Sequence, residues 1–158
     1  MHVLIASDLA GYQFKCKLLE ALTKEGYDIT DIGCHSSTEG EYPVYGKHAG
    51  EKVVSGEYER GIVICGSGNG ITMAANKVNG VRAALCDNVY SAFLSREHND
   101  ANILGLSAWG LKVEDAVKIV EVWLFAKFAG GKHEKRVEML KKIEDEQRQK
   151  STSSPAHH

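Results

Sequence analysis

A cysteine followed by a glycine-rich loop is the part of this sequence whose residue types best suit chemistry. An apolar run over residues 61–64 ends at Cys65, and three of the next five residues are glycine. This pattern predicts a strand, a tight turn and then a helix over residues 71–77. Alternating glycines let the backbone curl so that several N–H groups point into one concavity at the positive end of that helix. Such a concavity suits an anion or a developing oxyanion, and the same field would favour the thiolate form of Cys65.

Three interpretations of this segment compete. Dinucleotide binding is indicated by Gly66-x-Gly68 after a strand and by Asp87 near the distance expected of a ribose contact, but Ile71 stands where a third glycine belongs. A cysteine-phosphatase loop is excluded, because it needs an arginine at that position to bind the phosphoryl oxygens. A buried structural cysteine, followed by a loop that merely needs glycine, stays open because free cysteines are commonly buried.

The composition is that of an ordinary globular protein. The 158 residues suffice for one domain with a core, and a formal net charge of -2 gives no reason to expect nucleic-acid or membrane binding. No apolar segment approaches the roughly 20 residues that span a bilayer. The four cysteines are widely spaced, and no histidine pair has ligand spacing beside a carboxylate, so we expect no metal and no other cofactor. Reduced thiols and the lack of a signal-peptide pattern after Met1 predict a cytoplasmic protein.

Apolar segments of strand length alternate with amphipathic helical segments. Strands are expected at residues 2–6, 28–32, 61–65, 81–85 and 102–106. Helices are expected at residues 12–25, 43–56, 71–77 and 113–128, and after residue 88, where Tyr90, Phe93 and Leu94 would face inward. The alternation predicts an α/β fold, a three-layer α/β/α Rossmann-like sandwich around a five-stranded parallel sheet. We expect one domain over residues 1–150 that includes a C-terminal helix, and a disordered tail at residues 151–158.

The predicted strand ends gather polar residues at one edge of the sheet. In parallel sheets, ligands bind beyond the carboxyl ends of the strands. Four residues fall at or just after such ends: Asp8, Cys65, Asp87 and Ser107. We therefore expect Asp8 and Cys65 at one edge, which favours a functional role for Cys65, although Asp8 could also cap the following helix.

Six short segments carry a family resemblance. They are Ser7-Asp8-x-Ala10-Gly11, Glu41-Tyr42-Pro43, the residues from Ile64 to Ile71, Ala74-Ala75-Asn76-Lys77, the residues from Ser95 to Asp100, and Gly130-Gly131-Lys132-His133. In these segments, over about residues 1–145, the chain resembles the type B ribose-5-phosphate isomerases and the related galactose-6-phosphate isomerase subunits. The resemblance implies metal-free aldose–ketose isomerisation of a sugar phosphate, by default ribose 5-phosphate to ribulose 5-phosphate.

The resemblance also implies roles for individual residues. Cys65 would be the base that moves a proton between C1 and C2 through a cis-enediolate, Ser67 would act at the sugar hydroxyls, and His98 would assist ring opening. Asp8 and Asn99 would orient sugar hydroxyls. The other expected substrate-binding residues are Tyr42, Gly66, Gly68, Asn69, Gly70, Trp109, Lys132 and Arg136. Members of the family are dimers whose partner donates the His98-Asn99 segment, so we expect a homodimer, or a tetramer, with a shared site.

Three positions depart from the family pattern. Members typically have histidine where Leu9 stands, arginine where Trp109 stands and frequently arginine where Lys132 stands, whereas Arg136 matches. These four positions are expected to bind the phosphate, and lysine lacks the bidentate fork of arginine. Two lost charge-assisted contacts, at about 1.5–3 kcal/mol each, would weaken phosphate binding roughly a hundredfold or more.

The departures leave alternatives open. Lys112 or His133 could supply the missing charge, and Trp109 could instead stack against a sugar face. The same chemistry could act on another pentose or hexose phosphate or on an unphosphorylated sugar. A sugar-binding paralogue without catalysis is a further alternative, against which the intact Cys65, Ser67 and His98 argue.

Overall fold

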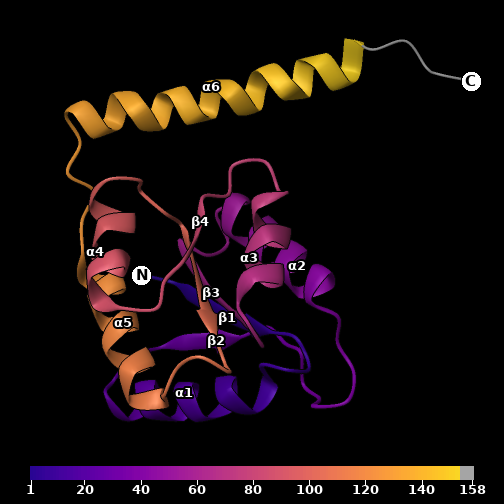
Figure 1. Ribbon diagram of the computed structural model, residues 1–158, viewed down its shortest axis with the longest axis vertical. Coiled ribbons are helices and arrows are strands. Elements are labelled where there is room, and N and C mark those ends of the chain that lie inside the picture. Colours follow the sequence, from indigo (N-terminus) through magenta and orange to yellow (C-terminus); the bar gives the residue numbers. More distant parts are fainter. Residues whose placement is uncertain (154–158) are drawn as a thin grey trace, which may run out of the picture.

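Five parallel strands form one sheet at the centre of the computed structural model, which describes residues 1–153 (Figure 1). The strands are β1 (Val3–Ser7), β2 (Ile29–Asp31), β3 (Arg60–Cys65), β4 (Ala83–Leu85) and β5 (Ile103–Ser107), in the order β2-β1-β3-β5-β4. The three central strands are almost entirely buried, as expected of apolar parallel strands covered on both faces. After β1, the chain places β2 on one side of that strand and β3 on the other. The crevice beyond the carboxyl ends of β1 and β3 is therefore the topological switch point, where such sheets bind ligands.

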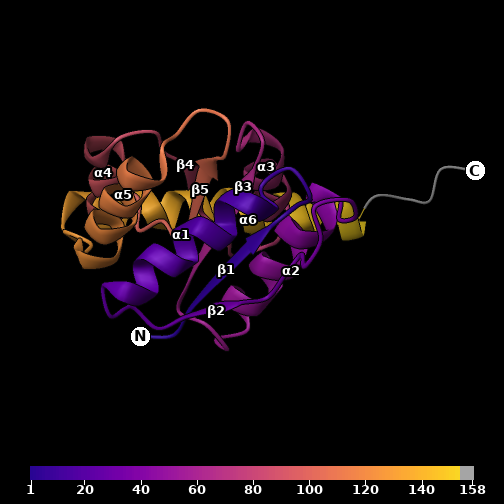
Figure 2. The same ribbon diagram turned by 90° about the horizontal axis from the view of Figure 1, so that it is seen from below.

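Helices cover both faces of the sheet and confirm the predicted three-layer architecture. The helices are α1 (Tyr12–Lys24), α2 (Tyr42–Val54), α3 (Asn69–Asn76), α4 (Val89–Glu97), α5 (Val113–Phe125) and α6 (Lys132–Ser153). Figure 2 shows α2 and α3 on one side of the strands and α4 and α5 on the other. Each face has its own apolar cluster: one joins the sheet to α1, α4 and α5, and the other joins it to α2 and α3.

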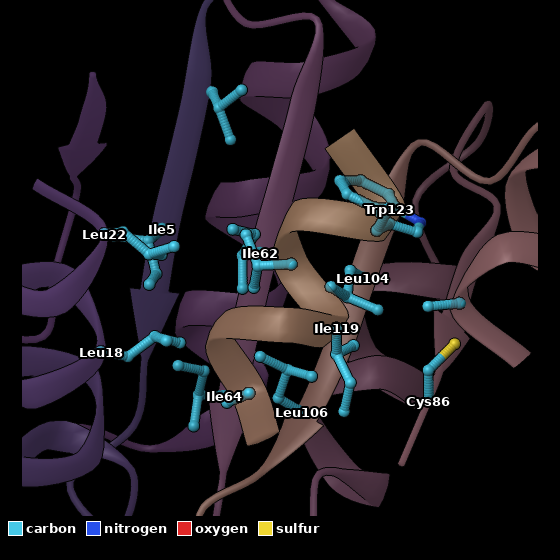
Figure 3. Packing of buried hydrophobic residues seen from close by; sticks show 14 residues of the cluster. Ile5, Leu18, Leu22, Ile62, Ile64, Cys86, Leu104, Leu106, Ile119 and Trp123 are labelled. Carbon is cyan, nitrogen blue, oxygen red and sulfur yellow. The ribbon is translucent and has the colours of Figure 1, made fainter. Parts of the chain in front are cut away.

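The first of these clusters is built from large aliphatic side chains (Figure 3). Ile64 and Leu106 of the sheet lie between Leu18 of α1 and Ile119 of α5 in this view, and Trp123 is fully buried at one end. Burying such a side chain stabilises the fold by about 1.5–3 kcal/mol. The cluster holds the central strands, and hence their carboxyl ends, in fixed positions.

Helix α4 differs from the prediction. Tyr90 is 69% exposed and Phe93 is also exposed, whereas the helix buries Ala92, Ser95 and Arg96. The Arg96 guanidinium can be buried because it donates to the Asp100 carboxylate (2.8 Å) and to the backbone oxygen of Ala101 (2.7 Å). The prediction that Tyr90 and Phe93 face inward is therefore wrong.

Helix α6 lies along the outside of the three layers (Figure 1). Val137 is its buried residue, and Met139, Leu140 and Ile143 are exposed. The backbone N–H of Gly80 donates to the Glu144 carboxylate, and the N–H of Ala129 just before the helix donates to the oxygen of Glu97. These contacts hold α6 against the end of α4 and the loop before β4.

Element boundaries differ from the sequence-based ones by a few residues. Helix α5 ends at Phe125 rather than at residue 128, because Ala126 has an extended backbone conformation. Helix α6 continues to Ser153, so residues 151–153 of the expected disordered tail are helical, and residues 154–158 lie outside the described part of the chain. Within residues 1–153, no helix is both long and apolar enough to span a bilayer.

Candidate active site

The strand register brings Asp8 and Cys65 to neighbouring positions, as the sequence predicts. Ser7 of β1 lies opposite Ile64 of β3, and Cys65 lies opposite Ser107 of β5. The backbone N–H of Asp8 donates to the oxygen of Ile64 at 3.2 Å. The polar residues that follow β1, β3 and β5 thus meet at the switch point.

Hydrogen bonds accepted by its carbonyl oxygens fix the conformation of the glycine loop at residues 66–70. The oxygen of Gly66 accepts hydrogen bonds from the Ser107 hydroxyl (2.8 Å) and from the backbone N–H of Trp109 (3.0 Å). The oxygen of Gly68, which has a left-handed φ of 81°, accepts a bond from the Thr72 hydroxyl at 2.6 Å. A trans peptide places its N–H opposite its C=O, so anchoring the Gly66 carbonyl turns the Ser67 N–H away from the β5 side.

Backbone amides of this loop, including those of Ser67 and Gly68, are available to a ligand. Within residues 1–153, the N–H groups of Ser67 and Gly68 have no hydrogen-bond partner, although Gly68 is buried. Buried N–H groups are rarely left without a partner, and at the N-terminus of α3 they face the positive end of the helix dipole. The loop therefore offers fixed donors suited to an oxyanion.

Cys65 itself is more enclosed than the loop that follows it. Its side chain is 4% exposed and belongs to the cluster beneath α2 and α3, near Ile71 and Tyr45. Cys65 does not line the neighbouring cavity that Ser67 and Ser107 help to form. Ser67 and Asn69, in contrast, are exposed. The thiol is thus a core residue at the border of the site.

Asp8 makes a structural hydrogen bond in addition to its candidate role of orienting sugar hydroxyls. Its Oδ1 accepts a hydrogen bond from the N–H of Gly11 at 2.9 Å, which closes the turn before α1. Burial raises the pKa of the Asp8 carboxyl, and the negative charge of Glu41 acts in the same direction, against hydrogen bonds from the N–H groups of Gly11 and Ala10.

Two aromatic rings lie against the ends of the glycine loop. A Cβ atom at Gly70 would lie 2.9 Å from the Tyr42 ring, and a Cβ atom at Gly66 would lie 2.5 Å from the Trp109 indole. Glycine at these positions is what lets the rings approach the backbone. Tyr42 is 43% exposed and Trp109 is 77% exposed, so both rings remain accessible.

The remaining expected site residues gather elsewhere, at the amino ends of the strands. His98, Asn99 and Arg136 line a cavity of about 300 Å³, together with His133, Val137 and Leu140. Arg82, just before β4, anchors the segment that carries His98 and Asn99. Its guanidinium donates to the backbone oxygens of Asn99 and Asp100. Within one chain, the predicted site residues therefore lie in two groups, one at the carboxyl ends of the strands and one at their amino ends.

His133 belongs to this second group, although it enters the sequence-based site only as a substitute cation. Its ring stacks on that of His98, with 4.1 Å between centroids and 11° between planes. Burial lowers the pKa of His133, and so do the positive charges of His98, Lys132 and Arg136, while Glu97 opposes them. Lys132 is exposed at the start of α6 and does not line the cavity. In the sequence, the segment Gly130-Gly131-Lys132-His133 is the signal that points to His133.

Comparison with known proteins establishes the family. A model of the ribose/galactose isomerase family matches residues 3–140. The chain belongs to the ribose/galactose isomerase family. Among curated members, it is 42% identical to ribose-5-phosphate isomerase B of Escherichia coli over 137 residues, which cover 87% of this chain and 92% of that protein. It is 40% identical to the putative sugar phosphate isomerase YwlF of Bacillus subtilis, over 92% of this chain and 98% of that protein.

Solved structures of the family have the same fold. Ribose-5-phosphate isomerase B of Clostridium thermocellum superposes with a TM-score of 0.89 at 48% identity, over 93% of this chain and 99% of that one. The enzyme of Mycoplasma genitalium, solved with bound ribulose 5-phosphate, superposes with a TM-score of 0.84 at 36% identity, over 92% and 97% of the two chains. The predicted family and fold class are therefore confirmed.

No ligand set for a metal is apparent in the described chain. Within residues 1–153, no group of three or more histidine, cysteine, aspartate or glutamate side chains is arranged to hold an ion. The polar groups at the switch point are backbone amides, hydroxyls and one carboxylate. These groups can bind and orient a polyhydroxylated substrate and stabilise an oxyanion.

Proposed function

We propose that this protein is an aldose–ketose isomerase that converts ribose 5-phosphate to ribulose 5-phosphate. The observation that carries the proposal is the position of Cys65 at the switch point, directly before two amides, of Ser67 and Gly68, that have no partner within residues 1–153. Membership of the family and a relative with bound ribulose 5-phosphate support the substrate.

The chemistry needs a base and an electrophile around one carbonyl. In the open-chain aldose, the Cys65 thiolate removes the hydrogen of C2, and the electron pair moves through the C1–C2 bond to the carbonyl oxygen. The amides of Ser67 and Gly68 stabilise the resulting enediolate. The thiol then returns the proton to C1, and the Ser67 hydroxyl passes a proton between O1 and O2. Carbon 1 is reduced as carbon 2 is oxidised, so no external oxidant or reductant takes part.

The opposite positions of the two residue groups favour a site shared by two copies of the chain. Asp8, Cys65 and Ser67 lie at the carboxyl ends of the strands, and His98, Asn99 and Arg136 lie at the amino ends. A single chain cannot bring both groups to one small sugar. We therefore propose a homodimer in which His98 of one chain assists ring opening at Cys65 of the other, and Arg136 binds the phosphate with Lys132.

Exposed apolar side chains on and beside the edge strand β4 are available for this association. Leu85 lies on the strand itself, Met73 on α3, and Val89, Tyr90 and Phe93 on α4. Edge strands and exposed aromatic side chains are features that proteins usually cover. The exposure of Tyr90 and Phe93 on α4 is explained if a second copy covers them.

A cytoplasmic location accords with this metabolic role. The four cysteines, Cys16, Cys34, Cys65 and Cys86, are all free. Free thiols persist in reducing compartments, which supports the proposed location.

The substrate is tested by comparing sugars. We expect kcat/KM for ribose 5-phosphate to exceed that for unphosphorylated ribose and allose in a coupled assay of ketose formation. Equal or higher kcat/KM for an unphosphorylated sugar would contradict the substrate and support the alternative that Leu9 and Trp109 motivate. Sugar binding without turnover of any aldose or aldose phosphate would support the non-catalytic alternative.

A further inference from the structure

Trp109 is a large aromatic side chain held in the open beside the glycine loop. It is 77% exposed, whereas the second tryptophan, Trp123, is fully buried. Exposing most of an indole to water forgoes the stabilisation that burying an aromatic ring provides. A rigidly held, exposed indole at a binding site is therefore a surface prepared for a ligand.

The turn that carries Trp109 is fixed to the loop by several hydrogen bonds. The Ser107 hydroxyl donates to the oxygen of Gly66 and accepts from the N–H of Gly110 at 2.9 Å. The N–H groups of Ala108 and Trp109 donate to the oxygens of Cys65 and Gly66. With one edge of the indole against Gly66, the ring is oriented before any ligand arrives.

The cavity beside the turn suits sugar hydroxyls better than a phosphate. It has a volume of about 330 Å³, Ser107 and Gly110 on either side of Trp109 line it although Trp109 itself does not, and its polar lining comes from Ser67, Asp87 and Ser107. Of residues 1–153, no lysine, arginine or histidine lines this cavity. A carboxylate repels a phosphate dianion but accepts hydrogen bonds from hydroxyl groups.

We propose that Trp109 stacks on the C–H face of the bound sugar and recognises its uncharged, hydroxylated carbon chain, independently of the phosphate. The sugar hydroxyls then face Ser67, Asp87 and Ser107. This inference rests on the proposed function, in which the phosphate lies near Arg136 of the second copy. It makes Trp109 a specificity-determining residue for the carbon skeleton.

Tryptophan fluorescence tests the stacking directly. We titrate Cys65→Ala protein, which should bind without turnover, with ribose 5-phosphate and with ribose, and follow emission and acrylamide quenching. Both sugars should change the emission and protect it from acrylamide. The response should vanish in the Cys65→Ala/Trp109→Phe protein, because the buried Trp123 does not meet the ligand. Bound sugar, seen by calorimetry, without a fluorescence change would overturn the proposal. Emission that is already protected in the ligand-free protein would do the same, because a second copy then covers the ring.

Affinities separate the stacking from phosphate binding. In the Cys65→Ala background, Trp109→Ala should raise Kd by about 3- to 10-fold, and by the same factor for both sugars, whereas Trp109→Phe should keep it within about twofold. Arg136→Ala should raise Kd for ribose 5-phosphate alone. A loss in Trp109→Ala that is confined to the phosphorylated sugar would overturn the proposal.

The two proposals can fail separately. If the protein binds both sugars through Trp109 but isomerises neither, the stacking is supported and the proposed function is contradicted. If the wild-type protein isomerises ribose 5-phosphate and Trp109→Ala leaves KM unchanged, the proposed function is supported and the stacking is contradicted.

Discussion

The contact between Gly66 and Trp109 makes a residue-level prediction about stability. A Cβ atom at Gly66 would lie 2.5–2.6 Å from three atoms of the indole. We expect Gly66→Ala to destabilise the fold by about 1–3 kcal/mol through overpacking. The same substitution in the Trp109→Ala background should cost much less, because the clashing ring is gone. Urea unfolding of the four proteins measures this coupling, and additive costs would contradict it.

The buried carboxyl of Asp8 makes a prediction about pH. Burial raises the pKa of Asp8, so the folded state holds this proton more tightly than the unfolded state. The protonated side chain therefore contributes stability below the unfolded pKa of about 3.9, and this contribution is lost as pH rises through the folded pKa. Asp8→Asn keeps an oxygen that can accept from Gly11 but cannot ionise. Its stability relative to wild type should therefore rise between about pH 3 and pH 7. A difference in melting temperature that is constant with pH would contradict this assignment.

At the scale of elements, a partly buried ion pair joins α1 to the end of β2. Lys15 is fully buried, and its ammonium donates to Asp31 (2.8 Å) and to the backbone oxygen of Cys34 (2.5 Å). Gly33 and Cys34 in turn exchange backbone hydrogen bonds with Ser7, next to Asp8. Lys15 thus braces the segment that borders the site.

Removing the Lys15 ammonium should lower the stability of the fold. We expect Lys15→Met to lower the free energy of unfolding by about 1.5–3 kcal/mol, because the partly exposed Asp31 carboxylate and the backbone oxygen of Cys34 lose a charge-assisted hydrogen-bond donor. Lys17→Met is the matched control: Lys17 is exposed on the same helix, and its substitution should change stability by less than about 0.5 kcal/mol. Guanidinium unfolding compares the two variants. Equal effects would mean that the ion pair does not brace the segment.

The sequence predicts the elements well because the alternation of apolar strands and amphipathic helices is a local pattern. The placement of Asp8 and Cys65 follows from that pattern, since carboxyl ends of parallel strands meet. Periodicity could not tell which apolar face of α4 meets the sheet: Tyr90 and Phe93 repeat at helical spacing, as interface residues and core residues both do. The stacking of His133 on His98 could not be predicted either, because it depends on where α6 packs.

At the scale of the whole molecule, the split site predicts complementation between inactive variants. Cys65→Ala and His98→Ala should each be inactive or nearly so as pure proteins. When the two are unfolded together and refolded, half of the dimers should combine one chain of each, and each such dimer has one intact site. The mixture should therefore recover about a quarter of the wild-type specific activity, by random pairing of the chains. No recovery, with mixed dimers shown by mass spectrometry, would place the whole site within one chain.

The surface around β4 makes a second prediction at this scale. Tyr90→Asp together with Phe93→Asp places two charges on the surface that we assign to the second copy. We expect a monomer in analytical ultracentrifugation with unchanged circular dichroism, because both side chains are exposed in the single chain. Glu20→Lys and Lys24→Glu, on the exposed face of α1, provide a control that should leave the assembly intact. A dimer that survives the aspartate substitutions would show that another surface is used.

The central claim is that the enclosed thiol of Cys65 takes the hydrogen of the sugar's second carbon, and solvent deuterium exchange measures this most directly. In heavy water, wild-type protein should exchange the C2 hydrogen of ribose 5-phosphate, and Cys16→Ala, which removes an exposed cysteine of α1, should do so at the same rate. Cys65→Ala should bind the sugar but abolish the exchange. Exchange at the wild-type rate in Cys65→Ala would contradict the account.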